Sequence, residues 1–221
     1  MSLLRSAYLF FYNLAQALGW ALSLFRILSN LSSSKSTNGA FSSAGQLICI
    51  LQSLAFLEVI HGAVGIVPSG VLLPLMQWGG RTHFLFAIVR RISEVQELPS
   101  VFITFVAWGV SEVIRYSHYA LYCIGSSPKW ITLIRYNAFI VLYPIGVFPG
   151  EKPMVAAVWL MYQALPFIKK ENLYAYSHPF SYYNFVLLLL FCYPFLWLKL
   201  YLHLFKQRRS KLGKQEKKKR S

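Results

Sequence analysis

Apolar residues form long uninterrupted stretches along this chain, and polar residues gather between them. A helix needs about 20 mainly apolar residues to cross a bilayer, and four stretches meet that length. They are residues 7–28, 45–67, 100–124 and 183–205. The pattern therefore predicts a transmembrane helix at each of these positions, the first of them an uncleaved span.

Two further apolar regions are less regular. Residues 71–92 contain Arg81 before the apolar run 84–89, and they predict a weaker third span. Residues 130–168 are too long for one helix, and prolines and a glycine interrupt them between 144 and 153. Such a break at membrane depth is tolerated where it is buried in protein or lines a cavity. We therefore expect a functional site in this region.

The charge distribution predicts the topology. Nine of the 22 basic residues lie in 206–221, directly after the last apolar stretch. By the positive-inside rule this segment is a cytosolic tail, and an even number of spans then places the N-terminus in the cytosol too. We expect an all-α bundle of six spans in residues 1–205, followed by the tail 206–221. The number becomes seven if 130–168 crosses twice.

Composition excludes several classes of protein. The chain is 56% hydrophobic and 13% charged, whereas soluble domains are about 25% charged. The net charge of +15 comes largely from a tail without aromatic residues, which favours membrane lipid over nucleic acid as its partner. All seven acidic residues are Glu, a poor set for magnesium-dependent phosphoryl transfer. The three cysteines are too far apart in the sequence to suggest a zinc cluster or a disulfide framework.

Ionisable residues occur inside the predicted spans, where each costs about 2.5–3.5 kcal/mol on insertion scales and calls for an explanation. Glu58 and His61 are three residues apart and so lie on one helix face, and the ionisable residues of the three regions could converge on one polar cavity. The alternative is local pairing, Glu112 with Arg115, and Glu58 with His61 or a neighbouring helix. The residues are Glu58 and His61 in the second span, Glu112, Arg115, Tyr116 and His118 in the fourth, and Arg135, Tyr136, Tyr143 and Glu151 in the fifth region.

Searches for known catalytic motifs narrow the chemistry. None of the three cysteines is followed by Arg at the spacing of the tyrosine-phosphatase loop, and the chain has no nucleophile elbow, Walker loop or histidine pair at metal spacing. Acid–base chemistry by Glu, Tyr and His remains, and it requires neither a metal nor a cofactor.

The element Tyr143-Pro144-Ile145-Gly146, preceded by Arg135-Tyr136-Asn137 and followed by Glu151, closely resembles the 3-hydroxyacyl-CoA dehydratase family, also called the protein-tyrosine-phosphatase-like A family. The chain is similar to plant PASTICCINO-type members in particular. The resemblance covers most of the chain. It extends to Tyr12-Asn13, Gly19-Trp20, residues 56–62, residues 111–116 and residues 164–167.

This resemblance implies an enzyme of the endoplasmic-reticulum membrane that removes water from (3R)-3-hydroxyacyl-CoA during very-long-chain fatty-acid elongation. The family's catalytic Tyr and Glu correspond to Tyr143 and Glu151. Which of the two takes the proton is left open. Glu58, His61, Glu112, Arg115 and Tyr116 become candidates for supporting or cavity-lining roles. The implied partners are the long-chain acyl-CoA substrate and the other elongase subunits, namely the condensing enzyme and the reductases. Lys218 and Lys219 resemble a dilysine retrieval signal.

Two alternatives stay open, one because of a departure from the family pattern and the other because charged residues lie inside the predicted spans. Glu151 follows Tyr143 by eight positions, whereas seven is common in the family and places both residues on one helical face. A catalytically impaired scaffold of the elongase complex therefore remains an alternative. A small transporter whose paired charges line a pathway is the other.

Overall fold

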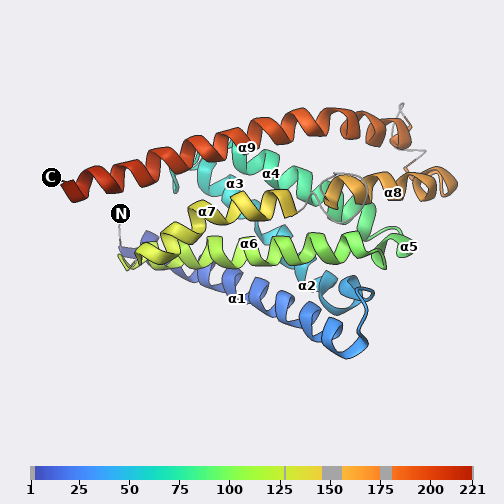
Figure 1. Ribbon diagram of the computed structural model, residues 1–221, viewed down its shortest axis with the longest axis horizontal. Helices are drawn as coiled ribbons and strands as arrows, with labels where there is room; N and C mark the ends of the chain where they lie inside the picture. Colours follow the sequence, from blue (N-terminus) through green and yellow to red (C-terminus); the bar gives the residue numbers. More distant parts are fainter. Residues whose placement is uncertain (1–2, 127, 146–155, 175–180, 221) are drawn as a thin grey trace. The chain divides into compact units, whose positions relative to one another are not determined.

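The structure is a computed structural model that describes residues 3–126, 128–145, 156–174 and 181–220. Every regular element in these ranges is a helix, which confirms the all-α prediction. The chain divides into two compact units, unit 1 (Met1–Ser127) and unit 2 (Pro128–Ser221). Figure 1 shows the helices of each unit.

Unit 1 contains the first four predicted spans. The stretch 45–67 is divided between two helices at Ala55, and the stretch 71–92 forms an α-helix that continues directly into a π-helix. The elements are α1 (Leu3–Ser34), α2 (Ala40–Leu54), α3 (Phe56–Ala63), α4 (Leu72–Thr82), η1 (His83–Val89), α5 (Ser93–Gln96) and α6 (Pro99–Cys123).

Helix α1 packs along α6 and against α2 (Figure 1). Its buried positions follow the three- and four-residue spacing of a single helical face. Several of these inward positions are polar, whereas large apolar side chains cover much of the outward face. The buried residues are Leu9, Asn13, Gln16, Ala17, Trp20, Ser23 and Ile27.

The start of α2 is tied to the segment before α6. Gly39 precedes α2 with φ 79°, a left-handed conformation that glycine adopts without steric cost. Its backbone N–H donates to Glu97 Oε2 at 2.9 Å. Pro99 then occupies the first turn of α6, where its missing N–H costs nothing. The hydrogen bond between Gly39 and Glu97 thus joins the start of α2 to the segment that precedes α6.

A reciprocal set of hydrogen bonds holds α4 against α2. Gln52 Nε2 donates to the carbonyl of Trp78 at 3.2 Å and to Thr82 Oγ1 at 3.1 Å. Trp78 Nε1 donates back to the carbonyl of Gln52 at 3.0 Å. No residue of α4 is buried, but η1 buries Phe84, Leu85, Ile88 and Val89. The continuous helix formed by α4 and η1 thus changes from α- to π-helical winding where its side chains become buried.

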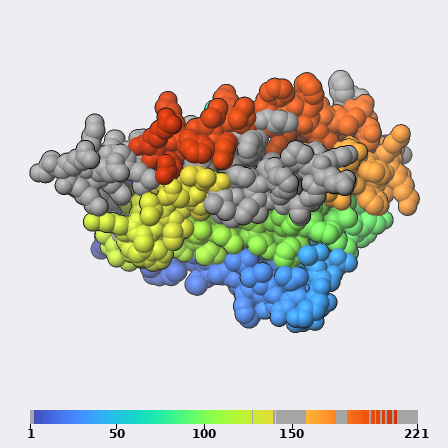
Figure 2. Space-filling view, in the orientation of Figure 1, coloured from blue at the N-terminus to red at the C-terminus, as the bar shows by residue number. Residues whose placement is uncertain are grey.

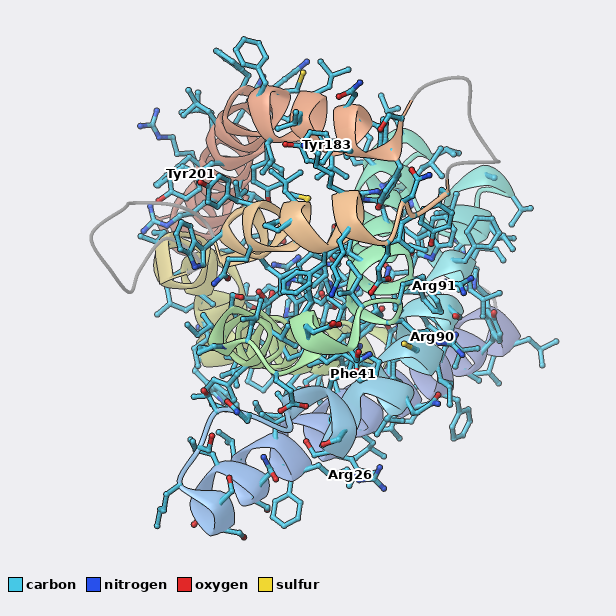
Figure 3. The ribbon with its side chains drawn as sticks, turned by 90° about the vertical axis from the view of Figure 1, so that its right-hand side faces the viewer. Arg26, Phe41, Arg90, Arg91, Tyr183 and Tyr201 are labelled. Carbon is cyan, nitrogen blue, oxygen red and sulfur yellow. The ribbon has the colours of Figure 1, made fainter. Side chains whose placement is uncertain are left out.

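Unit 2 contains α7 (Lys129–Ile145), α8 (Ala156–Lys170) and α9 (Tyr182–Arg220). Both shorter helices contact α9, and Figure 1 shows them following one another along it while α9 runs in the opposite direction. Lys169 Nζ lies 5.9 Å from the ring centroid of Tyr183, which Figure 3 labels near the start of α9. Arg208 Nε donates to Asn137 Oδ1 at 2.9 Å near the other end.

The structure refines the prediction for the fifth region. Within 130–168 it describes two helices, α7 and α8, where the sequence left one interrupted span or two spans open. The tail begins as helix, because α9 continues without a break from the last predicted span to Arg220. The division at residue 205 stays a prediction.

Among the described residues, one helical segment, Ala40–Ala63, which comprises α2 and α3, is both long and apolar enough to cross a membrane by composition. The six-span arrangement is therefore not confirmed. In α1 and α6 the apolar stretches are interspersed with buried polar residues such as Gln16 and Glu112, which lower the mean hydropathy of both helices.

Two glycines give a paired test of this packing. A Cβ on Gly62 would lie 2.2 Å from the backbone oxygen of Gly70, whereas a Cβ on Gly79 would meet nothing within 4 Å. We expect Gly62→Ala to lower the free energy of unfolding by about 1–3 kcal/mol through overpacking. Gly79→Ala should leave it unchanged or raise it by up to about 1 kcal/mol, because alanine favours helix. Thermal unfolding of both variants in detergent measures the difference, and equal midpoints would contradict the packing of α3.

Candidate functional site

A polar cluster in the interior of unit 1 is built on α6. Glu112, Arg115 and Tyr116 are three and four residues apart, so they share one face of this helix. Glu112 and Tyr116 are each only 1% exposed. A buried carboxylate is costly unless opposite charges and hydrogen-bond donors satisfy it.

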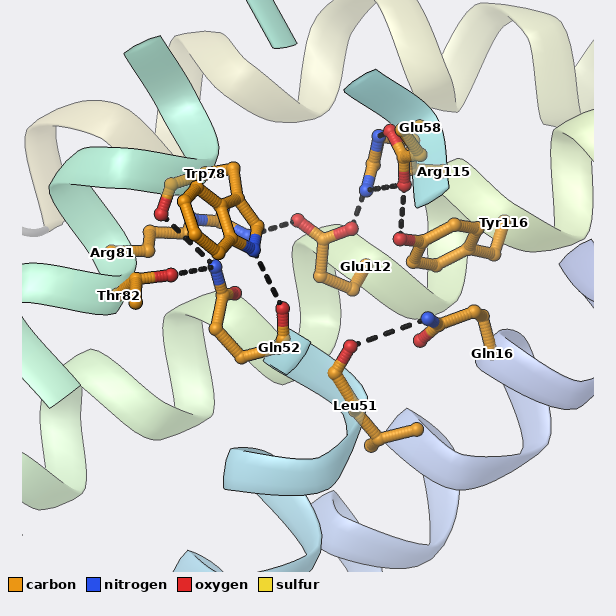
Figure 4. A network of polar contacts seen from close by, with 10 residues as sticks. All are labelled: Gln16, Leu51, Gln52, Glu58, Trp78, Arg81, Thr82, Glu112, Arg115 and Tyr116. Atoms are coloured by element: carbon orange, nitrogen blue, oxygen red, sulfur yellow. Dashed lines mark hydrogen bonds and ion pairs between the residues drawn. The ribbon is translucent and has the colours of Figure 1, made fainter. Parts of the chain in front are cut away.

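Arg115 is the centre of this cluster (Figure 4). Its Nε donates to Glu112 Oε2 at 2.6 Å within α6. Its two terminal nitrogens donate to both carboxylate oxygens of Glu58 in α3, at 2.6 and 2.9 Å. This bidentate geometry is the strongest arrangement of an arginine–carboxylate pair, and it fixes α3 against α6.

Arg81 of α4 completes the charge balance. Its Nη1 donates to Glu112 Oε1, and its guanidinium carbon lies 4.9 Å from the ring centroid of Trp108 in α6. Two cations and two anions from α3, α4 and α6 therefore form one electrically neutral network, which we call the ion-pair network. It consists of Glu58, Arg81, Glu112 and Arg115.

Aromatic residues of α1 border the network. Tyr116 donates its hydroxyl to Glu58 Oε1, and the ring of Tyr12 lies edge-on to Tyr116 with 6.2 Å between centroids. Tyr8 and His61 Nε2 are hydrogen-bonded at 2.8 Å, and the ring of Tyr12 lies edge-on to His61 at 5.2 Å. His61 is thus hydrogen-bonded to the neighbouring helix α1, one of the two pairings left open by the sequence.

The structure brings together four of the five supporting residues expected from the sequence, namely Glu58, Glu112, Arg115 and Tyr116, with His61 beside them. Arg81 was not among the expected site residues. The sequence contained evidence for it. Glu58 and Glu112 outnumber Arg115, so neutrality required a second cation inside the apolar spans.

Of the two expected catalytic residues, the structure describes the position of one. Tyr143 is in the last turn of α7, in unit 2, and Glu151 lies outside the described residues. Arg135 and Tyr136 are also in α7. Convergence of the fifth region with the cluster of unit 1 therefore stays a prediction.

The ion-pair network is suited to holding helices together. Both oxygens of each carboxylate accept hydrogen bonds from guanidinium groups, and Glu58 accepts a further one from Tyr116. A carboxylate engaged in this way is a weak candidate for a catalytic base. Within the described ranges no group of three His, Cys, Asp or Glu residues could hold a metal ion.

The described residues are those of a helical protein whose unit 1 contains a buried, electrically neutral ion-pair network. The chain belongs to the family "Protein tyrosine phosphatase-like protein, PTPLA", whose model matches residues 52–214. The family resemblance seen in the sequence is thereby confirmed.

Curated relatives match over nearly the whole chain. The mouse (Mus musculus) very-long-chain (3R)-3-hydroxyacyl-CoA dehydratase 1 is 34% identical over 96% of this chain and 75% of the relative. The human (Homo sapiens) dehydratase 2 is 35% identical over 96% of this chain and 84% of the relative. The human dehydratase 3 is 32% identical over 97% of this chain and 60% of the relative. No solved structure matches this chain.

The charge balance of the ion-pair network can be tested by mutation. Glu112→Gln removes the anion shared by Arg81 and Arg115 and leaves the buried network with excess positive charge. We expect the free energy of unfolding to fall by about 3–5 kcal/mol, as when one partner of a buried ion pair is lost. Glu58→Gln should cost less, because the Glu58 side chain is 23% exposed and Arg115 keeps Glu112. Thermal unfolding of purified protein in detergent measures both losses.

A double variant serves as the control for this experiment. Arg81→Gln combined with Glu112→Gln removes one charge of each sign and restores neutrality. The double variant should be more stable than Glu112→Gln alone, a non-additivity expected of directly interacting residues. Simple addition of the two single losses would show that net charge is not what stabilises the network.

Proposed function

We propose that this chain is a very-long-chain (3R)-3-hydroxyacyl-CoA dehydratase. The observation that carries the proposal is 34–35% identity over 96% of the chain to relatives that bear this name. The Tyr143-Pro144-Ile145-Gly146 element followed by Glu151 adds support, because the proposed reaction needs an acid and a base and this element contains both residue types.

The reaction removes one proton and one hydroxyl group from adjacent carbons. A base takes the proton from C2, next to the thioester, the electron pair forms the C2–C3 double bond, and the C3–O bond breaks. The departing hydroxyl takes up a proton and leaves as water, so the step involves no oxidation or reduction. Tyr143 and Glu151 are the proposed pair for these two proton transfers.

The four glutamates of unit 1 are less suited to the role proposed for Glu151. Glu58 and Glu112 are occupied by guanidinium groups. Glu97 accepts from the backbone of Gly39, and Glu94 from the hydroxyl of Ser93. Each of these carboxylates already has a local partner. Glu151 is the glutamate that lies closest in sequence to the Tyr-Pro-x-Gly element.

We also propose that the protein is a multi-pass protein of the endoplasmic-reticulum membrane. The exposed residues of α1 support a lipid environment, because Leu4, Phe11, Leu18 and Phe25 repeat every seven positions and are 62–84% exposed. The face of α1 that contacts α6 is the more polar one, the reverse of a soluble helix. Figure 2 shows α1 and α2 as the blue surface of unit 1.

Six crossings with both termini in the cytosol remain the proposed topology. Because α7 and α8 follow one another along α9 in the same direction, they are consistent with one interrupted crossing.

The condensing enzyme and reductases of the elongation cycle would supply the substrate and consume the product, and they are the proposed partners.

The catalytic assignment predicts large losses from conservative changes. Tyr143→Phe and Glu151→Gln should each lower the rate of dehydration of a long-chain 3-hydroxyacyl-CoA by about a hundredfold or more, the usual scale for a positioned acid or base. The double variant should be little worse than the worse single variant, because groups acting as a unit are non-additive. Single-turnover assays of purified protein in detergent measure these rates.

Glu171→Gln is the matched control, because Glu171 is exposed after α8. This substitution should alter the rate of dehydration less than twofold. Near wild-type activity of Glu151→Gln would remove Glu151 from the mechanism. If wild-type protein itself does not dehydrate the substrate but still associates with elongase subunits, the scaffold alternative is favoured.

The topology predicts that both ends of the chain lie on the same side of the membrane. A reporter fused before Met1 and another fused after Ser221 should both respond as cytosolic, because the basic segment 206–221 favours that side. Protease protection or glycosylation of the reporters in intact microsomes measures their location. Ends on opposite sides would mean that α7 and α8 each cross the membrane.

A further inference from the structure

A hydrogen bond between α7 and α9 in unit 2 places the expected catalytic tyrosine relative to the charges of α9. Helix α9 runs opposite to α7 and α8 and contacts both. The hydrogen bond between Arg208 Nε and Asn137 Oδ1 fixes the register of α7 on α9. Tyr201, labelled in Figure 3, lies on α9 close to the level that this register assigns to Tyr143.

The level follows from helix geometry. Tyr143 is six residues after Asn137, so its backbone lies about 9 Å further along the axis of α7. In the antiparallel α9 that height corresponds to about six residues before Arg208, near residue 202. Residue 202 is close to the end of the apolar part of α9, and the basic part begins at Lys206. The expected catalytic tyrosine is thus placed at the boundary between the apolar and the basic halves of α9.

The basic side of this boundary offers three cationic side chains within one turn. Lys206 and Arg209 are exposed and Arg208 is partly exposed. The acidic residue nearest to them in α9 is Glu216, eight positions after Arg208 and about 12 Å away along the axis. Within α9, the basic side of this boundary therefore has a net positive charge.

Asn137 accepts a hydrogen bond from Arg208 and is itself hydrogen-bonded to the backbone of α7. The amide nitrogen of Asn137 donates to the carbonyl of Leu133 at 2.7 Å, and its amide oxygen accepts from Arg208. These two bonds orient the guanidinium group before any ligand arrives. A pre-oriented guanidinium suits phosphate, which it binds with paired N–H donors.

We propose that Arg208, with Lys206 and Arg209, binds the phosphorylated nucleotide end of the coenzyme A thioester. This inference rests on the proposed function and deepens it. The apolar half of α9 then lies on the acyl-chain side and the basic half on the nucleotide side, with the thioester between them at the level of Tyr143. The pantetheine arm is long enough, when extended, to span the axial distance of about 9 Å between Tyr143 and Arg208.

The substrate distinguishes this site from a general attraction to membranes. We would compare a long-chain 3-hydroxyacyl-CoA with the same acyl group on pantetheine, which lacks the nucleotide and its phosphates, using purified protein in neutral detergent. Arg208→Gln should raise KM for the CoA ester about tenfold or more, the scale of one charge-assisted hydrogen bond, with kcat nearly unchanged. Kinetics with the pantetheine ester should be the same for wild type and variant.

Two further variants act as controls. Lys217→Gln removes the same charge from the same helix, but about 14 Å further along the axis, and should change KM less than twofold. Arg208→Lys keeps the charge without the paired donors and should give an intermediate KM. Adenosine 3′,5′-bisphosphate should inhibit the wild type and inhibit Arg208→Gln at least about tenfold more weakly.

Each contrary result has a distinct meaning. Equal losses on the CoA and pantetheine esters would show that Arg208 stabilises the fold, which overturns the proposal. An unchanged KM together with weaker binding of Arg208→Gln and Lys217→Gln alike to phosphatidylserine vesicles would assign the basic segment to lipid headgroups. If wild type shows no dehydration, the proposed function fails, and calorimetric binding of adenosine 3′,5′-bisphosphate to wild type and Arg208→Gln decides the site by itself.

Discussion

Charge neutrality in an apolar interior is the constraint on which unit 1 depends. Each charged group of the ion-pair network would be very costly to bury alone, so each needs an opposite charge beside it. Helices α3, α4 and α6 must therefore meet in one relative arrangement before the charges are satisfied. Apolar packing brings the helices together non-specifically, and the paired hydrogen bonds of Arg115 select the register of α3 and α6.

How far the sequence predicts this arrangement depends on the distance between partners. The pairing of Glu112 with Arg115 follows from helical spacing alone, and the structure has it. The contact of Glu58 with Arg115 joins residues 57 positions apart, and periodicity within one helix contains no information about it. Arg81 lay in a stretch with weak helical and apolar signals, so its inward direction depended on the packing of α4 against α2.

The fifth region shows a different limit. Proline and glycine predicted an interruption, and the described helices α7 and α8 lie on either side of it. Apolar length alone could not show that the two would follow one another along α9. The helical structure of the tail was not predicted, although Lys, Arg, Gln and Glu are good helix formers and residues 206–220 contain no proline.

The π-helix η1 has a consequence for comparing this chain with its relatives. Hydrogen bonds from residue i to i+5 place more residues in each turn than α-helical bonds do. The angular positions of Arg81 before η1 and of Leu85 and Ile88 within it are therefore not those of one continuous α-helix. A relative that lacks one residue between 83 and 89 can wind the same column as α-helix and keep both faces in place. A single-residue alignment gap here would mark a change of helical winding inside a continuous helix, and should not be moved to the nearest loop.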